Sequence, residues 1–277
     1  MSEFTEKLLV FTDIHISDLG KTIIDLDPLE QFQTGLAHAI QSHPDAARII
    51  ITGDLAHNGE IAEYQHLRNA LENVPIPVTL MIGNHDDRDN FLSVFPETKC
   101  TESGHVQEML VLGDTCLVTL DTVDAPPYPK GRHAGHLCNA RLDWLETALK
   151  RANGRRVIIF THHPPFRVGF PAMDAIRLRN DTALLALLQR FPNVQHLFAG
   201  HVHRTISGNI GGLGFTMFKS PCHQMPMVLK GGDDSLSTNE PGAYGIVLLS
   251  PENVVAHTED FELARGPHPK SADALPH

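Results

Sequence analysis

This chain is rich in histidine, and several of the histidines belong to short polar motifs that directly follow apolar runs. The chain has 18 histidines among 277 residues. Histidine is the commonest metal ligand in proteins, so its positions are the first place to look for chemistry. Five polar motifs each follow an apolar run: Asp13-x-His15, Gly53-Asp54, Gly83-Asn84-His85-Asp86, Thr161-His162-His163 and Gly200-His201-Val202-His203.

The side chains in these motifs suit a divalent metal site. They offer carboxylate, amide and imidazole donors, and no cysteine stands among them. Such oxygen and nitrogen donors fit Mn, Fe, Co, Zn or Mg. A glycine at 53, 83 and 200 comes just before an expected ligand. Glycine is expected there because the backbone must turn sharply or approach a neighbour closely.

The elements that must position these motifs are short apolar strands alternating with amphipathic helices. Strands are predicted at 8–12, 48–52, 78–82, 117–120, 157–161 and 196–199. Helical spacing of apolar residues predicts helices around 29–40, 64–71, 142–149 and 184–188. This alternation indicates βαβ units, and in open α/β sheets ligands bind where the carboxyl ends of the strands meet. We therefore expect five strands to carry the five motifs to one edge.

The last third of the chain has a different pattern. Strands without intervening helices are predicted at 205–207, 214–219, 244–249 and 254–258, which indicates an antiparallel sheet that completes the fold. Three Pro/Gly-rich stretches are candidate active-site loops, at 123–135, 164–171 and 221–242. We expect one domain over residues 1–265 and a loosely held tail over residues 266–277.

Composition excludes several classes of protein. Hydrophobic residues make up 42% of the chain, which is enough for a full core, and the net charge is −11. That charge opposes binding to a nucleic acid polymer or an anionic membrane. The four cysteines have no CxxC pairing, which argues against a disulfide framework. No apolar run approaches the ~18 residues of a membrane span, and the N-terminus lacks a signal-like apolar stretch, so a cytoplasmic location is predicted.

Taken in order, the five motifs resemble those of the calcineurin-like metallophosphoesterase superfamily, and the matching blocks span residues 13 to 203. Several stretches are similar to bacterial class III cyclic-nucleotide phosphodiesterases and glycerophosphodiesterases: Gly83 to Asp86, His162 to Pro165, Gly135 to Leu137 with Trp144 to Glu146, and His223-Gln224 before Pro226. The resemblance implies an α/β fold in which a sandwich of two sheets is flanked by helices (αββα). This fold agrees with the strand and helix pattern.

The resemblance also implies a cofactor of two divalent metal ions (Mn, Fe, Zn or Co). The implied ligands are Asp13, His15 and His203 for the first ion, Asn84, His162 and His201 for the second, and Asp54 as the bridge. Two divalent ions exceed the charge of two aspartates and a bridging hydroxide by one unit, which suits a phosphodiester monoanion. An acidic protein can therefore bind an anionic substrate, because bound ions are the largest local charges.

Three residues are predicted to act on the substrate. His85 directly follows the implied ligand Asn84, so we expect it beside the metals without being a ligand. In the family this histidine stabilises the transferring phosphoryl group or protonates the leaving alkoxide. Asn84 and His223 are expected to contact the phosphate, His223 by similarity to the glycerophosphodiesterases.

The other histidines are assigned less directly. His57 follows Asp54 by three residues, and it either faces the cluster or caps the next helix. His163 is expected to be a structural neighbour, since successive side chains diverge. The remaining histidines considered are expected at the surface or in loops: His38, His43, His66, His133, His136, His257, His268 and His277.

The predicted function is hydrolysis of a small phosphodiester, either a 3′,5′-cyclic nucleotide or a glycerophosphodiester, by a metal-activated hydroxide. One alternative is a metal-free interaction scaffold on the same fold. Another is a phosphomonoesterase or nuclease of the same superfamily. The expected partner is a small-molecule diester rather than a nucleic acid or a membrane, and a homo-oligomer is left open.

Overall fold

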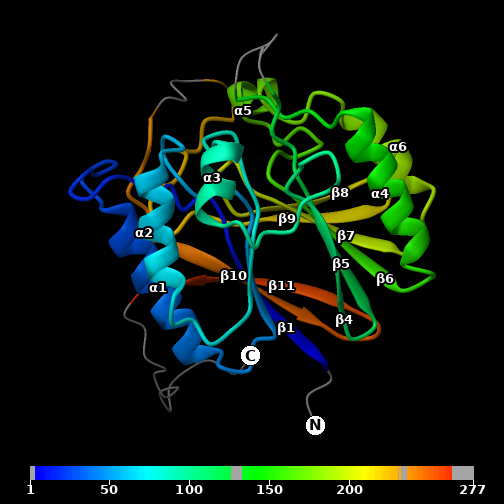
Figure 1. The fold of residues 1–277 in the computed structure, drawn as a ribbon, viewed down its shortest axis with the longest axis horizontal. Helices are drawn as coiled ribbons and strands as arrows, with labels where there is room; N and C mark the ends of the chain where they lie inside the picture. Colours follow the sequence, from blue (N-terminus) through cyan, green and yellow to red (C-terminus); the bar gives the residue numbers. More distant parts are fainter. Residues whose placement is uncertain (1–3, 126–132, 230, 232–235, 264–277) are drawn as a thin grey trace, which may run out of the picture.

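Two stacked β-sheets form the centre of the molecule, and helices cover the outer face of each (Figure 1). The structure, a computed structural model, describes residues 4–125, 133–229, 231 and 236–263. The first sheet has the strand order β11-β10-β1-β2-β3 and the second has the order β4-β5-β6-β7-β9-β8. The strands are β1 (Glu6–Phe11), β2 (Arg48–Ile51), β3 (Val78–Leu80), β4 (Glu108–Leu112), β5 (Thr115–Leu120), β6 (Arg156–Thr161), β7 (Val194–Ala199), β8 (Ile206–Ile210), β9 (Leu213–Met217), β10 (Ala243–Leu249) and β11 (Val254–Asp260).

The helices divide between the two outer faces. Figure 1 shows α1, α2 and α3 on one side of the sheets and α4 and α6 on the other. The helices are α1 (Pro28–Ser42), α2 (Ile61–Leu71), α3 (Arg88–Val94), α4 (Asn139–Arg151), α5 (Pro171–Ala175) and α6 (Asp181–Gln189). None of the helices among the described residues is long and apolar enough to cross a membrane.

Apolar side chains on the central strands alternate between the two faces of each sheet, and both faces are buried. In β1, Leu8 and Val10 pack into the core between the two sheets, whereas Leu9 and Phe11 pack under the helices of the first sheet. Successive side chains of a strand point to opposite faces, so each of these strands contributes to two cores. The predicted αββα sandwich is confirmed by this arrangement of three hydrophobic clusters.

The last third of the chain corrects the sequence prediction in one respect. β8, β10 and β11 pair antiparallel with their neighbours, as expected, but β9 pairs parallel with β7 through His196 to Ala199 and Gly214 to Met217. The prediction failed here because β8 and β9 form a hairpin that lies beside β7. β9 therefore extends the parallel part of the sheet, and its carboxyl end lies with the others.

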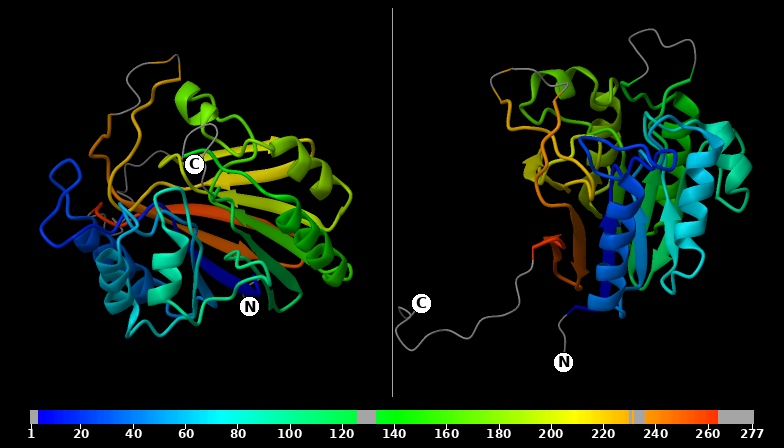
Figure 2. Two further views of the ribbon diagram at one scale, coloured as in Figure 1. Left: turned by 45° about the horizontal axis from the view of Figure 1, so that its top comes forward. Right: turned by 90° about the vertical axis from the view of Figure 1, so that its left-hand side faces the viewer.

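The carboxyl ends of the parallel strands set the position of the loops that follow them. Figure 2 shows the long loops gathered at the end of the molecule away from the N-terminus. The predicted tail, residues 266–277, lies outside the described residues.

Candidate metal centre

The seven predicted ligands come from the ends of five strands and meet at one place. β1, β2 and β3 belong to the first sheet, whereas β6 and β7 belong to the second, so the site lies across the carboxyl ends of both sheets. Six of the seven side chains are buried, and His203 is half-buried. The residues brought together are Asp13, His15, Asp54, Asn84, His162, His201 and His203.

Backbone hydrogen bonds join the loops that carry these residues. Asp13 N–H donates to the carbonyl of Gly53, and His15 N–H donates to the carbonyl of Asp54, at 3.0 and 2.9 Å. Across the two sheets, the N–H of His201 donates to both carboxylate oxygens of Asp13, each at 3.0 Å. Hydrogen bonds of the protein itself therefore hold these loops together.

One set of donor atoms lies around His15. Its Nε2 is 3.1 Å from Nε2 of His203 and 3.7 Å from Oδ2 of Asp54. Oδ1 of Asp13 is 3.5 Å from the same His203 nitrogen. Donor atoms that share one ion at about 2.0–2.2 Å lie about 3–4 Å apart, so these spacings are compatible with a common ion.

A second set lies around His162. Its Nε2 is 3.1 Å from Oδ1 of Asn84 and 3.4 Å from Oδ1 of Asp54. The ring of His201 lies 5.2 Å from the His162 ring, measured between centroids. Oδ2 of Asp54 faces the first set and Oδ1 faces the second, so Asp54 would be placed between two ions if each set held one.

Hydrogen bonds at Nδ1 of two of the predicted histidine ligands turn the Nε2 atoms toward the centre of the site. Nδ1 of His162 lies 3.0 Å from the carbonyl oxygen of Thr52, and Nδ1 of His203 lies 3.0 Å from that of His223. A carbonyl only accepts, so Nδ1 of each ring donates outward and Nε2 is the ring atom that faces the other donor atoms of the site. In addition, Nε2 of His201 is buried without a hydrogen-bond partner in the described structure. A buried nitrogen without a partner is costly, so the site is suited to hold a cation beside it.

The pKa shifts of the site residues reflect both the charge of Asp54 and the burial of the histidines. Burial alone would lower the pKa of His162, but the charge of Asp54 and a hydrogen bond to it raise that pKa to about 9. Burial likewise opposes ionisation of Asp54, yet His162 and His85 hold the Asp54 pKa well below its usual value. In contrast, burial lowers the pKa of His201 well below 6.5, which keeps this ring neutral as a metal ligand must be.

Backbone strain is concentrated at the same residues. Left-handed φ angles between 47° and 76° occur at five of the seven predicted ligands: Asp13, His15, Asp54, His201 and His203. Such conformations cost on the order of 1–3 kcal/mol each in non-glycine residues and persist where the surroundings enforce them. The expected close approach is also present at Gly83, where a Cβ atom would lie 2.2 Å from Oδ1 of Asp54.

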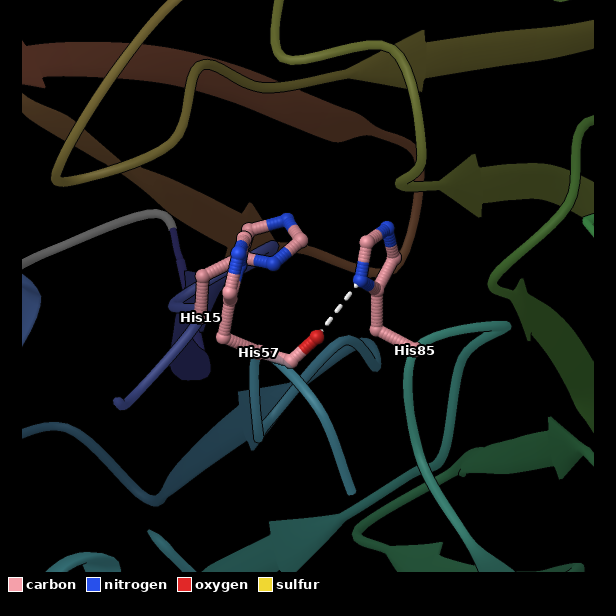
Figure 3. A group of neighbouring side chains, drawn as sticks. All are labelled: His15, His57 and His85. Atoms are coloured by element: carbon pink, nitrogen blue, oxygen red, sulfur yellow. Dashed lines mark hydrogen bonds between the residues drawn. The ribbon is translucent and has the colours of Figure 1, made fainter. Parts of the chain in front are cut away.

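His85 lies beside the two sets, as expected, and its orientation is fixed at two points. Its backbone N–H donates to Oδ1 of Asp54 at 2.9 Å. Its ring Nδ1 donates to the carbonyl of His57 at 2.8 Å (Figure 3). With Nδ1 occupied, Nε2 is the ring atom left to act on a substrate.

The structure resolves the two alternatives for His57. Its ring lies 5.5 Å from the His15 ring and 5.6 Å from the His85 ring, measured between centroids, and it lines the cavity over the site. It does not cap α2, whose N-cap is Glu60. His57 therefore faces the cluster.

His163 is buried against the site, but both of its ring nitrogens are engaged elsewhere. Nδ1 lies 2.7 Å from Oγ1 of Thr122, and Nε2 donates to the carbonyl of His133 at 3.0 Å. Its ring lies 4.7 Å from that of His201, measured between centroids. This geometry makes His163 a structural neighbour with no nitrogen free for an ion.

Two residues of the site were missed by the sequence analysis. His133, expected to be an ordinary surface or loop residue, is exposed but hydrogen-bonds to Asn84 and lines the cavity. Asp86 received no role, yet its buried carboxylate accepts the N–H groups of Leu55, Ala56 and Gly83 at 2.7 to 3.1 Å. The signal for Asp86 was its place in the Gly83–Asp86 motif, whereas nothing in the local pattern distinguishes His133.

A cavity of about 200 Å³ opens over the donor atoms. His57, His85, His133 and His223 line it together with five of the seven predicted ligands: His15, Asp54, Asn84, His201 and His203. The rest of its wall is apolar apart from Ser237 and consists of Met173, Ile176, Met225 and Leu236. A larger hollow of about 790 Å³ lies along the edge formed by β3 and β4, and none of the predicted site residues lines it.

Comparison with known proteins agrees with this geometry. The model of the calcineurin-like phosphoesterase family matches residues 6–205, a range that holds all seven predicted ligands. The chain belongs to the calcineurin-like phosphoesterase family. A chain of known structure with a similar fold is a dimetal phosphatase from Danio rerio, with a TM-score of 0.70 and 14% identity over 93% of this chain and 97% of that chain. At that identity the likeness shows the fold alone.

Curated relatives of this phosphoesterase are named as phosphodiesterases. A probable cyclic nucleotide phosphodiesterase of Rhodopseudomonas palustris is 39% identical over 92% of each chain. A probable glycerophosphodiester phosphodiesterase of Arcobacter nitrofigilis is 28% identical over 93% of this chain and 94% of its own. A 3′,5′-cyclic adenosine monophosphate phosphodiesterase of Vibrio vulnificus is 28% identical over 90% of this chain and 87% of its own. The predicted enzyme class is thereby confirmed.

Proposed function

We propose that this phosphoesterase hydrolyses a small phosphodiester, a 3′,5′-cyclic nucleotide in preference to a glycerophosphodiester, at a site for two divalent ions. The observation that carries the proposal is the pair of donor sets on either side of Asp54, with nitrogen and oxygen atoms 3.1 to 3.7 Å apart. When bound, two such ions supply a nucleophile from water at neutral pH and neutralise charge on the phosphoryl oxygens.

The protein residues orient and complete this chemistry. His85 presents Nε2 to the cavity because its Nδ1 donates to the carbonyl of His57, so the ring, when protonated on both nitrogens, would be placed to give its Nε2 proton to the leaving alkoxide. His223 lines the cavity with an Nδ1 that is buried without a hydrogen-bond partner in the described structure. That atom supports the predicted contact between His223 and the phosphate. Asn84 holds its amide at the second donor set, next to where the phosphate would lie.

The composition of the cavity wall favours the cyclic nucleotide. A cationic head group, as in glycerophosphocholine, is recognised by a carboxylate or by the face of an aromatic ring. Among the described lining residues, Asp54 is the only carboxylate, and Phe, Tyr and Trp are absent. The methionines at 173 and 225 instead offer polarisable, adaptable surface to a flat base. The relative named as a probable cyclic nucleotide phosphodiesterase, at 39% identity, supports the same choice.

The alternative functions have less support. A metal-free scaffold is disfavoured because all seven ligand positions are filled and their donor atoms converge. A nuclease is disfavoured by the net charge of −11, which opposes a nucleic acid polymer. We keep a cytoplasmic location as part of the proposal.

A panel of substrates tests the proposal. The purified chain is stripped with a chelator, reloaded with Mn²⁺, and assayed first with bis(p-nitrophenyl) phosphate and then with cyclic AMP and glycerophosphocholine. We expect turnover of the diesters only with metal, and a higher kcat/KM for cyclic AMP. Absence of turnover for every diester with metal bound contradicts the proposed activity, and a preference for glycerophosphocholine contradicts the proposed substrate.

A further inference from the structure

The segment before α4 brings a further imidazole to the second donor set. Asn84 Nδ2 donates to Nδ1 of His133 at 3.0 Å, while Oδ1 of the same amide lies 3.1 Å from Nε2 of His162. Asn84 is buried and His133 is exposed at the cavity rim. The two ends of the Asn84 amide therefore face different partners, one outside the metal centre and one inside it.

The orientation of the Asn84 amide depends on the group that it contacts outside the metal centre, His133. Asparagine can bind an ion only through Oδ1, and a flipped amide would present its NH₂ group to the centre instead. In that orientation the Asn84 amide would offer the second ion no donor atom. An acceptor on the outer side of Asn84 opposes the flip, and Nδ1 of His133 is that acceptor.

The position of His133 is itself held by buried groups. Its backbone carbonyl accepts from Nε2 of His163 at 3.0 Å, and Nδ1 of His163 lies 2.7 Å from Oγ1 of Thr122 at the end of β5. Gly135 allows this packing, since a Cβ atom there would lie 2.5 Å from the His163 ring. The buried ring of His163 thus fixes the backbone at 133, and His133 then reaches Asn84.

We propose that His133 is a positioning residue for the second metal ion of the two-ion site proposed above. It acts through Asn84, whose amide oxygen it turns toward the ion, and it is not itself a ligand. We expect the contact between His133 and Asn84 to raise the affinity of the protein for the second ion. Loss of such a partner typically lowers metal affinity by about 10- to 100-fold.

Metal titration of three variants tests this role without any substrate. Apo protein is titrated with Co²⁺, followed by calorimetry and by the visible spectrum of the bound ion. His133→Leu removes the acceptor and keeps water from replacing it, so the second ion should bind about 10- to 100-fold more weakly and the first ion unchanged. His133→Asn restores an acceptor oxygen at the same number of bonds from Cα and should bind both ions nearly as the wild type does. His136→Leu, three residues away and not among the cavity-lining residues, is the matched control and should bind both ions normally.

A double-mutant cycle separates this role from a general effect on folding. In an Asn84→Ala background, His133→Leu should cause no further loss of affinity, because the group it acts through is gone. The inference is overturned if His133→Leu binds both ions like the wild type. It is also overturned if the loss persists in the Asn84→Ala background, or if His133→Asn binds as poorly as His133→Leu. A wild-type chain that binds fewer than two ions would instead contradict the two-ion site itself.

Discussion

Replacement of His85 tests the assignment of the proton donor without disturbing the metal centre. The bond that joins His85 to Asp54 is made by the backbone N–H, at 2.9 Å, so His85→Ala keeps it. What the substitution removes is the ring, with its Nδ1 bond to the His57 carbonyl and its Nε2 in the cavity. Both ions should therefore stay bound while proton transfer to the leaving group is lost.

The size of the expected loss depends on the leaving group. General acid catalysis contributes about 10²- to 10⁴-fold, which corresponds to about 3–5 kcal/mol of transition-state stabilisation. We expect kcat for cyclic AMP, whose alkoxide needs a proton, to fall by that amount. For bis(p-nitrophenyl) phosphate, whose leaving group departs as a stable anion, the loss should stay within about 10-fold.

A second variant at the same position removes the ambiguity of lost packing. His85→Asn keeps a donor that can reach the His57 carbonyl but places nothing at the position of Nε2. It should lose as much rate on cyclic AMP as His85→Ala does. The reasoning is refuted if either variant turns over cyclic AMP at the wild-type rate, or if His85→Ala no longer binds two ions by elemental analysis.

Three further predictions concern packing and stability. Gly83→Ala should abolish metal binding in a calorimetric titration, because its Cβ would lie 2.2 Å from Asp54 Oδ1; normal affinity would show that the loop adapts. Tyr64→Phe should lower the free energy of unfolding in urea by about 1–3 kcal/mol, since the hydroxyl donates to Asp86 and accepts from a backbone N–H, and a loss under ~0.5 kcal/mol would contradict this. His196→Asn should weaken the acid sensitivity of stability. Burial lowers the folded pKa of His196 to about 4 from an unfolded value near 6.5, so the unfolded chain binds more protons and wild-type stability falls as the pH drops from about 6.5 to 4. Urea midpoints at pH 7 and 5 that shift equally in both proteins would rule this out.

The parts of the fold that were predictable are those whose pattern is local. β1, β2, β6 and the second half of β7 (197–199) are apolar runs buried on both faces, and such runs are visible in the sequence without knowledge of their neighbours. β4 was missed because its residues are mostly only partly buried and it lies at the edge of its sheet. The direction of β9 was also missed, since pairing with β7 depends on where the β8–β9 hairpin lies in space.

The same limit applies to the site. Asp13 and Asp54 stand in motifs whose order along the chain indicates a shared centre, and the structure brings them together. The relation between His133 and Asn84 carries no such signal, because 49 residues separate them and the contact arises from the packing of His163. The role of His57 was undecided for a related reason: the spacing from Asp54 fits either direction of its side chain. Tertiary contacts decide these cases, and they are not encoded in any one segment.

Metal stoichiometry shows whether Asp54 joins two ion sites. Its Oδ1 lies 3.4 Å from His162 Nε2 and its Oδ2 lies 3.7 Å from His15 Nε2, so we expect each oxygen to serve one of the two donor sets. Elemental analysis after loading with Mn²⁺ and dialysis should give two ions per wild-type chain and none per chain of a folded Asp54→Ala variant. A wild-type chain that holds one ion or none, or an Asp54→Ala variant that still holds two, would contradict the account.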